Sequence, residues 1–499
     1  MSSPRQNIRV KAALLKPAAR AYGLAYLLVV GPPLLKLSLA LYSRKGLSSQ
    51  TTLHSIYRIF SEPLVFRGFP SFCGLLVGLS TLLQPLFKLL GDGHAPLYKY
   101  WPWRRHQRAN ALVVRFLSTL IAAWSGLPML QVPGQMVSTA VGSQGAKEEE
   151  ANHTPAGTCI ATDQKTAAVL CVKRPVALAG RTIDLTLFAV VRALDSSLGL
   201  LSSHYRDSLA VKEQTRSSKW PVFAYADVAL FVVSSGIVMD SWFYRPDALP
   251  KTYREWIRSA AQVDDRLVQV LRQARRGEFV YGEKSEKLSA LRSLCEDYRL
   301  PLAWSDPATT IPIPCELVHM GTGPSCHWHA LTRLIKAFKF ALAMYLPLQV
   351  LLQLRRPSRA AMLGASKAAL RSSMFLASFI SLFYYGVCLC RTQLGPRIFP
   401  SKFVSPMMWE QGLCVRAGCL LCGWSILIES KRRRQEIALF VAPRAATTFL
   451  PRQYDSKYFW RERTVFSVGV ALLFTLAYED PRRVRGMLGS VLHNILHSS

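Results

Sequence analysis

Cysteine and histidine side chains are concentrated in the stretch "CELVHMGTGPSCHWHALTRLIKAFKF" at 315–340. Cys315 and His319 form one pair, and Cys326 and His329 form a second pair six residues further on. Thiolates and imidazoles are the ligands that Zn²⁺ prefers, and four of them complete a tetrahedral structural site. The spacing matches no standard zinc finger. A structural zinc, a Cys315–Cys326 disulfide and an ordinary turn next to a membrane helix therefore stay open as interpretations.

Charged side chains also occur within the otherwise apolar stretch "GRTIDLTLFAVVRALD" at 180–195. At about 100° per residue, Arg181, Asp184, Arg192 and Asp195 fall on one face of a helix. These residues can pair with one another at a spacing of three. Such a helix either lies in the membrane interface or turns its charges into a helix bundle, where they would line an internal pathway.

The motifs of common enzyme classes do not occur in the sequence. There is no Gly-rich phosphate loop, no H-E-x-x-H and no G-x-S-x-G. We therefore expect a protein without enzymatic activity, and without a cofactor other than the possible structural zinc.

The composition indicates the kind of scaffold that positions these residues. Of 499 residues, 50% are hydrophobic and only 18% are charged, whereas soluble domains carry roughly 25% charged residues. The net charge of +32 arises from 62 Lys and Arg against 30 Asp and Glu. These basic residues bracket apolar segments, a pattern typical of contact with anionic lipid head groups. We expect membrane lipids as partners and no binding of nucleic acid.

Eight apolar segments approach the ~20 residues that a helix needs to cross a bilayer. We therefore predict an all-α, multi-pass bundle of about eight spans. The segment at 464–478 is short and needs a locally thinner bilayer. The predicted spans are 21–42, 70–90, 109–130, 221–243, 334–354, 372–390, 411–430 and 464–478.

A shift of 252 residues places 181–198 on 433–450 with several matching positions. A Trp-Ser pair follows an Arg in the span before each stretch, and a Pro follows the next span. We predict two similar copies, each of four spans plus one charged, partly buried helix. Doubling of this kind is common in membrane proteins that enclose a site between their copies. The matched charged residues are Arg181 with Arg433, Asp184 with Glu436, and Arg192 with Arg444.

These patterns divide the chain into five predicted segments. The first membrane copy includes a polar loop at 134–172. The predicted segments are a basic leader at 1–20, the first membrane repeat at 21–247, a charged helical linker at 248–314, a Cys/His-rich juxtamembrane motif at 315–333, and the second membrane repeat at 334–499.

The motif that opens the second half resembles the cysteine-rich N-terminal region of the transmembrane protein 135 family. The shared features are a Cys, a following His, and a Pro-Ser-Cys just before the span that ends "MYLPLQVLLQL". The family pattern also has ten residues between its two cysteines, but its His lies one place later than His319. The resemblance is strongest over 315–499 and extends to 109–260 through the internal repeat.

The resemblance implies a multi-pass protein of peroxisomal or mitochondrial membranes with a role in lipid and fatty-acid homeostasis and organelle dynamics. It implies no catalytic residues. Its partners would be membrane lipids, and other organelle membrane proteins or further copies of the same chain. The alternative is a transporter or translocation pore between the two repeats, distantly like the import-channel family of the mitochondrial inner membrane.

The matched arginines provide a test of the internal-pathway interpretation. If Arg192 and Arg444 are held inside the bundle, Lys cannot reproduce the planar, forked guanidinium. We expect Arg192→Lys and Arg444→Lys to insert normally and to restore cells that lack the protein only in part. Full rescue by both Lys variants, measured at equal membrane abundance, would instead place these helices at the membrane surface.

Overall fold

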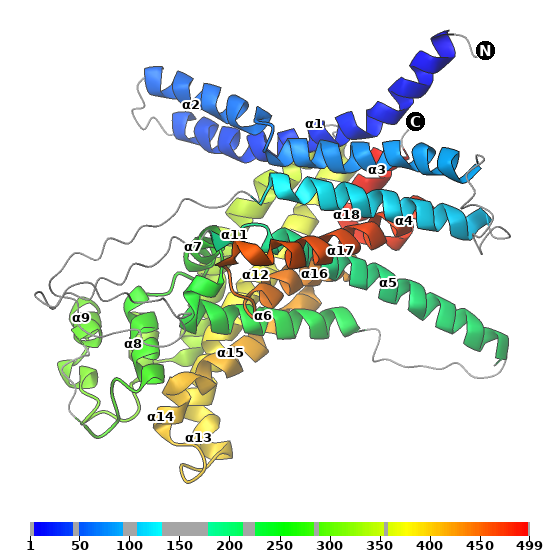
Figure 1. Cartoon of the computed structure of the whole chain (residues 1–499). Helices are drawn as coiled ribbons and strands as arrows, with labels where there is room; N and C mark the ends of the chain where they lie inside the picture. The colour runs from blue at the N-terminus through cyan, green and yellow to red at the C-terminus, as the bar shows by residue number, and fades with distance from the viewer. Residues whose placement is uncertain are drawn as a thin grey trace, which may run out of the picture. The chain divides into compact units, whose positions relative to one another are not determined.

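The computed structural model describes residues 4–42, 49–92, 107–131, 178–212, 225–283, 289–353 and 358–497 (Figure 1). These residues are mostly helical, as the sequence predicts. They also include one short ladder, in which β1 (Leu178–Ala179) pairs antiparallel with β2 (Tyr454–Asp455). The predicted polar loop at 134–172 lies outside the described residues.

The longer helices carry the apolar segments, and shorter helices connect them. The α-helices are α1 (Pro4–Tyr42), α2 (Ser49–Ser61), α3 (Phe69–Asp92), α4 (Gln107–Gly126), α5 (Ile183–Lys212), α6 (Ala226–Tyr244), α7 (Lys251–Ala261), α8 (Asp265–Arg276), α9 (Ser289–Asp297), α10 (Cys315–Val318), α11 (Cys326–Gln353), α12 (Arg359–Cys388), α13 (Gly395–Ile398), α14 (Pro406–Met408), α15 (Cys414–Gly423), α16 (Lys431–Thr447), α17 (Phe459–Glu479) and α18 (Gly486–Leu496).

Within the described residues, seven helical segments are long and apolar enough to cross a membrane. This identifies a multi-pass membrane protein. Six of the segments overlap predicted spans, and the seventh lies in α5, the helix expected to carry a charged stripe. The seven segments are Leu53–Phe87, Asn110–Met129, Ile183–Ser202, Ala226–Tyr244, Cys326–Leu351, Arg359–Gln393 and Pro406–Ile428.

Two predicted spans are not among these seven. The segment 464–478 is helical, but Arg461, Glu462 and Arg463 occupy the first turn of its helix, α17, and lower its mean hydropathy. The segment 21–42 lies in α1, several of whose side chains fall outside the described residues.

The chain divides into two compact units, the first of which comprises Met1–Ser197, Pro451–Val484 and Gly489–Ser499. In this unit α1 packs on α3, α3 on α4, and α4 on α17. The buried carboxylate of Glu462 opens α17 and accepts hydrogen bonds from three neutral side chains. The Thr186 hydroxyl is 3.0 Å away, the Gln131 amide is 3.3 Å away, and the third donor is the Tyr454 hydroxyl. These contacts attach α17 to α5, to β2 and to the residues that follow α4.

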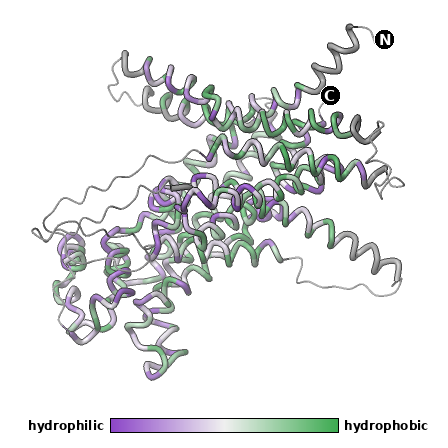
Figure 2. Tube along the Cα trace, in the orientation of Figure 1, coloured by the Kyte–Doolittle hydropathy of each residue, from purple (hydrophilic) through white to green (hydrophobic). Residues whose placement is uncertain are grey.

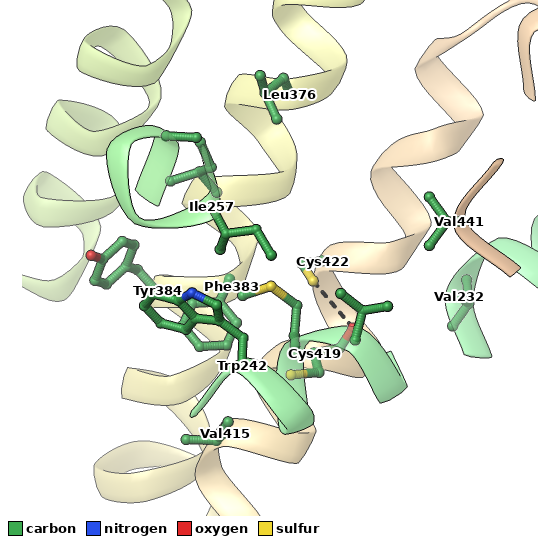
Figure 3. Close-up of a cluster of buried hydrophobic side chains, with 14 of the residues drawn as sticks. Val232, Trp242, Ile257, Leu376, Phe383, Tyr384, Val415, Cys419, Cys422 and Val441 are labelled. Carbon is green, nitrogen blue, oxygen red and sulfur yellow. Dashed lines mark hydrogen bonds between the residues drawn. The ribbon is translucent and has the colours of Figure 1, made fainter. Parts of the chain in front are cut away.

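The second unit comprises Leu198–Leu450 and Arg485–Leu488. Here α11 packs on α12, α12 on α15, and α6 on both α15 and α16. The helices approach closely because they cross at glycines: a Cβ on Gly386 would lie only 2.9 Å from the Cα of Gly418. Figure 3 shows part of the resulting core, in which Trp242, Phe383 and Cys419 lie together.

In the segment 248–314, predicted as a charged helical linker, the described residues 248–283 and 289–314 form helices that are too short to cross a membrane. Helices α8, α9 and α10, with the segments between them, share a small apolar core of their own, and we call them the lobe. Figure 2 shows hydrophilic residues interspersed along these helices. The core residues of the lobe are Leu267, Val270, Ala274, Phe279, Leu291, Leu294, Cys295, Ile313 and Leu317.

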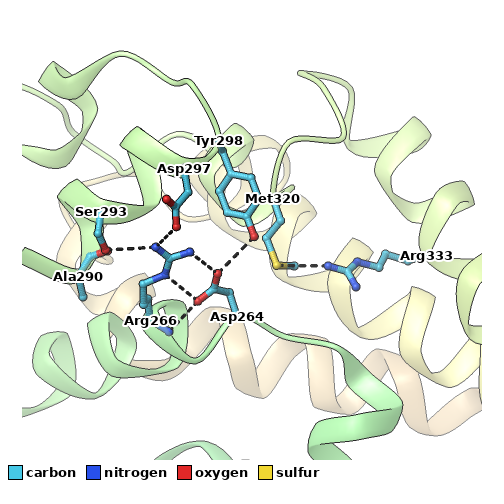
Figure 4. A network of polar contacts seen from close by, with 8 residues as sticks. All are labelled: Asp264, Arg266, Ala290, Ser293, Asp297, Tyr298, Met320 and Arg333. Carbon is cyan, nitrogen blue, oxygen red and sulfur yellow. Dashed lines mark hydrogen bonds and ion pairs between the residues drawn. The ribbon is translucent and has the colours of Figure 1, made fainter.

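The lobe is also held together by a polar network around Asp264, the N-cap of α8 (Figure 4). Its carboxylate accepts hydrogen bonds from the backbone and guanidinium of Arg266 and from the Tyr298 hydroxyl at 3.2 Å. Arg266 in turn lies 2.6 Å from Asp297 on α9. The hydrogen bonds from Arg266 lower the pKa of Asp264 below the ordinary value of 3.8.

This pKa shift predicts an acid-sensitive lobe. A carboxylate whose folded pKa is lowered stabilises the fold above its unfolded pKa, and the contribution is lost as the pH falls through the folded value. We expect Asp264→Asn, which retains an N-cap acceptor, to cost about 1 kcal/mol at neutral pH. Hydrogen exchange of the α8 amides should therefore be faster in the variant at pH 7.

The difference should shrink once the pH falls below about 4, where Asp264 protonates in the unfolded chain before it does so in the folded lobe. Asp265→Asn is the matched control, since that carboxylate lies in the same helical turn and its side chain is 53% exposed. Equal α8 exchange in wild type and Asp264→Asn at pH 7 would show that the charge contributes nothing.

Candidate metal centre

Four buried side chains from three helices meet in the second unit. Cys315 opens α10, His319 follows it directly, Cys326 opens α11, and Cys388 ends α12. Their potential ligand atoms all lie within 4.8 Å of one another. Three thiols and one imidazole at this separation form a donor set suited to Zn²⁺.

The local backbone explains how His319 and Cys326 come to face the same point. Between them the chain reverses through three residues with positive φ, namely Met320 at 49°, Gly321 at 76° and Gly323 at 103°. Gly321 also has little room for a side chain, because a Cβ there would lie 3.2 Å from the ring of Tyr298. The "GTG" sequence thus permits a tight reversal that an ordinary helical segment would not make.

Hydrogen bonds orient the imidazole of His319 toward the cluster. Its Nδ1 lies 2.7 Å from the carbonyl oxygen of Gly323. Because a carbonyl only accepts, Nδ1 carries the proton and Nε2 keeps its lone pair. That Nε2 lies 3.6 Å from the Cys388 sulfur. Imidazoles that bind metals are typically oriented by such a hydrogen bond from the other ring nitrogen.

The thiol of Cys315 has an environment that favours the thiolate. Its sulfur lies 3.3 Å from the Thr392 hydroxyl. Hydrogen bonding with Cys388, together with the positive charge of Arg391 and the Thr392 hydroxyl, outweighs burial and lowers the pKa of Cys315 to about 5. The deprotonated form is the one that binds metals.

The structure brings together three of the four predicted ligands and places His329 elsewhere. The ring of His329 stacks on that of His319 with centroids 4.6 Å apart. Its Nδ1 lies 2.6 Å from the Thr322 hydroxyl, which itself donates to the carbonyl of His319. The structure thus makes His329 a neighbour of the predicted site, with Cys388 completing the cluster. Cys315 and Cys326 are both free thiols.

Cys388 is not among the predicted ligands because it lies in an apolar segment, where a thiol is usually a small hydrophobic group. The lengths of the consecutive helices α11 and α12 are the feature of the sequence that could have indicated Cys388 as a ligand. These consecutive helices have 28 and 30 residues and pack extensively on each other. An antiparallel pair of nearly equal length brings the first residue of one helix, Cys326, close to the last residue of the other, Cys388.

A buried ion pair lies beside the cluster. Arg391 and Glu410 approach to 3.3 Å, and their side chains are 4% and 2% exposed. Arg391 lies in a π-helical turn, η7 (Leu389–Gln393), and such turns are rare and frequently found at functional sites. Glu410 lies in η8 (Trp409–Leu413), where Gly412 with a φ of 132° interrupts the helix.

This ion pair holds the lobe by the backbone of Ile313. The Tyr281 hydroxyl donates to Glu410 at 3.1 Å and accepts from the Ile313 N–H at 3.0 Å. Arg391 donates to the Ile313 carbonyl. Both backbone polar groups of one residue, two positions before Cys315, are therefore fixed by this pair and its tyrosine. We call this arrangement the Ile313 clamp.

The residues predicted as a buried charged stripe occupy varied environments. Arg181 is exposed, Arg192 is buried, and Asp184, Asp195, Arg433, Glu436 and Arg444 are partly buried. Asp184 lies 3.6 Å from Arg452, Arg433 lies 3.8 Å from Glu429, and Glu436 lies 3.8 Å from Arg432.

The two matched arginines make one contact in common. The guanidinium of Arg192 lies 5.4 Å from the ring centroid of Phe188, and that of Arg444 lies 5.9 Å from the ring centroid of Phe440. Each aromatic ring precedes its arginine by four residues, which places the two on one helix face. Whether the stripe lines an internal pathway stays a prediction.

The helices and the cluster define a class: a multi-pass helical membrane protein with a candidate metal centre between its membrane helices and a small polar lobe. Comparison with known protein families, curated proteins and solved structures gives no match to this chain.

The ligand set can be tested by metal analysis of the purified chain. We expect about one equivalent of zinc in the wild type and loss of most of it in Cys388→Ser, since a structural site needs all four ligands. Cys390→Ser is the matched control, because that cysteine lies two residues away and outside the cluster. His329→Gln should retain its zinc. If Cys388→Ser retains its zinc and His329→Gln loses it, the result would instead support His329 as the fourth ligand, as predicted from the sequence.

Proposed function

We propose that the cluster of Cys315, His319, Cys326 and Cys388 is a structural zinc centre in a non-enzymatic multi-pass membrane protein. The observation that supports this most is the meeting of four buried donors, with His319 oriented by the Gly323 carbonyl. All four ligand positions come from the chain, as in structural zinc sites, whereas catalytic zinc sites keep one position open for water or substrate.

We further propose that the protein acts in an organelle membrane, peroxisomal or mitochondrial, in lipid and fatty-acid homeostasis and organelle dynamics. This proposal rests on the resemblance of residues 315–340 to the cysteine-rich region of the transmembrane protein 135 family. Anionic lipids are suitable partners for a chain with a net charge of +32. Other organelle membrane proteins or further copies of this chain are the protein partners that we propose.

We also propose that the chain consists of two similar copies, 21–247 and 334–499, and that the last membrane helix of each copy packs with helices of the other. Two packing series support it: α1–α3–α4–α17 in the first unit and α11–α12–α15–α6 in the second. In these series α6 and α17 take corresponding places. In the sequence, however, α6 ends the first copy and packs with helices of the second, whereas α17 belongs to the second copy and packs with helices of the first. Both helices also carry an acid in the first turn: Asp227 lies 3.3 Å from Arg434, and Glu462 lies 3.0 Å from the Thr186 hydroxyl.

A transporter or translocation pore is the second candidate. The doubled arrangement favours it, because such repeats commonly enclose a substrate site. Charges within apolar helices favour it too, for example Asp240 on α6, which lies 3.3 Å from Arg416 on α15. The Lys variants of Arg192 and Arg444 address this candidate independently of the zinc centre.

Cells that lack the protein test the main proposal. We expect slower growth on oleate and altered peroxisome or mitochondrial shape. Wild-type protein and Cys390→Ser should restore both, whereas Cys388→Ser should not, because it removes a zinc ligand. Growth rates and fluorescence images with organelle markers are the measurements.

Membrane abundance of each variant must be compared, so that loss of protein is distinguished from loss of function. Normal growth, unchanged lipid profiles and unchanged organelles in the cells that lack the protein would contradict the lipid role.

A further inference from the structure

The candidate metal centre lies where the lobe meets the membrane helices of the second unit. Cys315 and His319 belong to the lobe, which has a small apolar core of its own, although Val268 of α8 packs in the core of the membrane helices. Cys326 and Cys388 belong to the membrane-spanning helices α11 and α12. A metal held by all four side chains would therefore tie the lobe to the membrane helices.

We infer that this centre is a metal-dependent latch: bound metal fastens the end of the lobe at α10 to α11 and α12, and loss of the metal releases it. This inference rests on the proposed zinc centre and adds a regulatory role to it. The Ile313 clamp is a second fastening that needs no metal, because it consists of hydrogen bonds and the Arg391–Glu410 ion pair.

The apolar contact between the lobe and the membrane helices is incomplete. A cavity of about 50 Å³ lies there, with Val270 and Leu291 of the lobe on one side and Phe383 and Val387 of α12 on the other. Atoms that line a void lose the dispersion contacts that close packing would supply. The polar fastenings therefore carry a larger share of the attachment than they would across a filled interface.

A third attachment keeps α8 in place whether or not the metal is bound. Arg272 on α8 donates to the carbonyl of Phe243 at 2.5 Å, and Arg275 lies 4.2 Å from the ring centroid of Tyr244. Both contacts are at the end of α6, far along the chain from the cysteines. Release of the latch should therefore loosen the segments near Tyr281 and Cys315 and leave α8 attached.

Hydrogen exchange of the full chain in detergent micelles, followed by mass spectrometry, tests the latch. Zinc-loaded protein should protect the peptides 277–283 and 311–323. Removal of zinc by a chelator should raise their exchange at least tenfold, while peptides from 265–276 and 372–387 stay unchanged. Cys388→Ser should behave like the chelated protein, and Cys390→Ser like the loaded wild type.

Tyr281→Phe separates the two fastenings, since it removes the hydroxyl that joins Glu410 to Ile313 and keeps the ring and the ligands. We expect it to bind zinc as the wild type does. After chelation, its 311–323 peptide should exchange several-fold faster than that of the chelated wild type. Equal exchange of this peptide in the two chelated proteins would show that the Ile313 clamp does not hold the segment 311–323.

The possible failures are distinguishable. Wild-type protein that binds no zinc would overturn the proposed centre and the latch together. Protein that binds and releases zinc with no change at 311–323 would overturn the latch alone. Faster exchange of 372–387 as well after zinc removal would show that the metal stabilises the whole helical core. This result would also overturn the latch.

Discussion

The arrangement around the candidate centre depends on the burial of Arg391 and Glu410 away from water. Removing one partner of a buried ion pair leaves an uncompensated charge, at a cost of roughly 3–5 kcal/mol. The two side chains must therefore meet, and each comes from a locally distorted segment: Arg391 from the π-helical turn η7, and Glu410 from η8, which Gly412 interrupts with a φ of 132°. An extra residue in a helical turn changes the direction of the side chains that follow it, so the ion pair and these local distortions belong together.

The buried ion pair also fixes the position of the lobe, through the backbone of Ile313. With its guanidinium held by Glu410, Arg391 donates to the carbonyl of Ile313, and Tyr281 bonds both Glu410 and the Ile313 N–H. Cys315 follows two residues later and opens α10. The buried ion pair thus fixes the backbone that leads into Cys315 and directs its sulfur toward Cys388.

The part of this architecture that the sequence predicts is the part that depends on local pattern. Apolar segments of about 20 residues identify six of the membrane-spanning helices, because hydrophobic length is a property of consecutive residues. The tight turn at Gly321 and Gly323, with a Cys or a His on either side, likewise indicates a site. The sequence also identifies Cys315, His319 and Cys326, which lie within a dozen residues.

What could not be predicted depends on pairing between distant segments. Cys388 joins the cluster only through the packing of α11 on α12, while His329 has suitable chemistry but turns its ring to stack on His319. The Arg391–Glu410 pair gives no local signal either, since isolated charges near the ends of apolar segments usually reach water or lipid head groups. Helix α5 is a related case: four charged residues suggested a separate class of helix, yet its apolar residues make it long and hydrophobic enough to cross a membrane.

The charge of the proposed zinc centre explains why an arginine is buried beside it. Three thiolates and one neutral imidazole around Zn²⁺ carry a net charge of −1, which is costly in a low-dielectric interior. Arg391 lies next to this site, and its charge already favours the thiolate of Cys315. A guanidinium can serve several acceptors at once because it has five donors in a fixed plane. Arg391 can therefore bond the Ile313 carbonyl, pair with Glu410 and place donors near the Cys315 thiolate, whereas a lysine at the end of a flexible stem could not hold all three in one geometry.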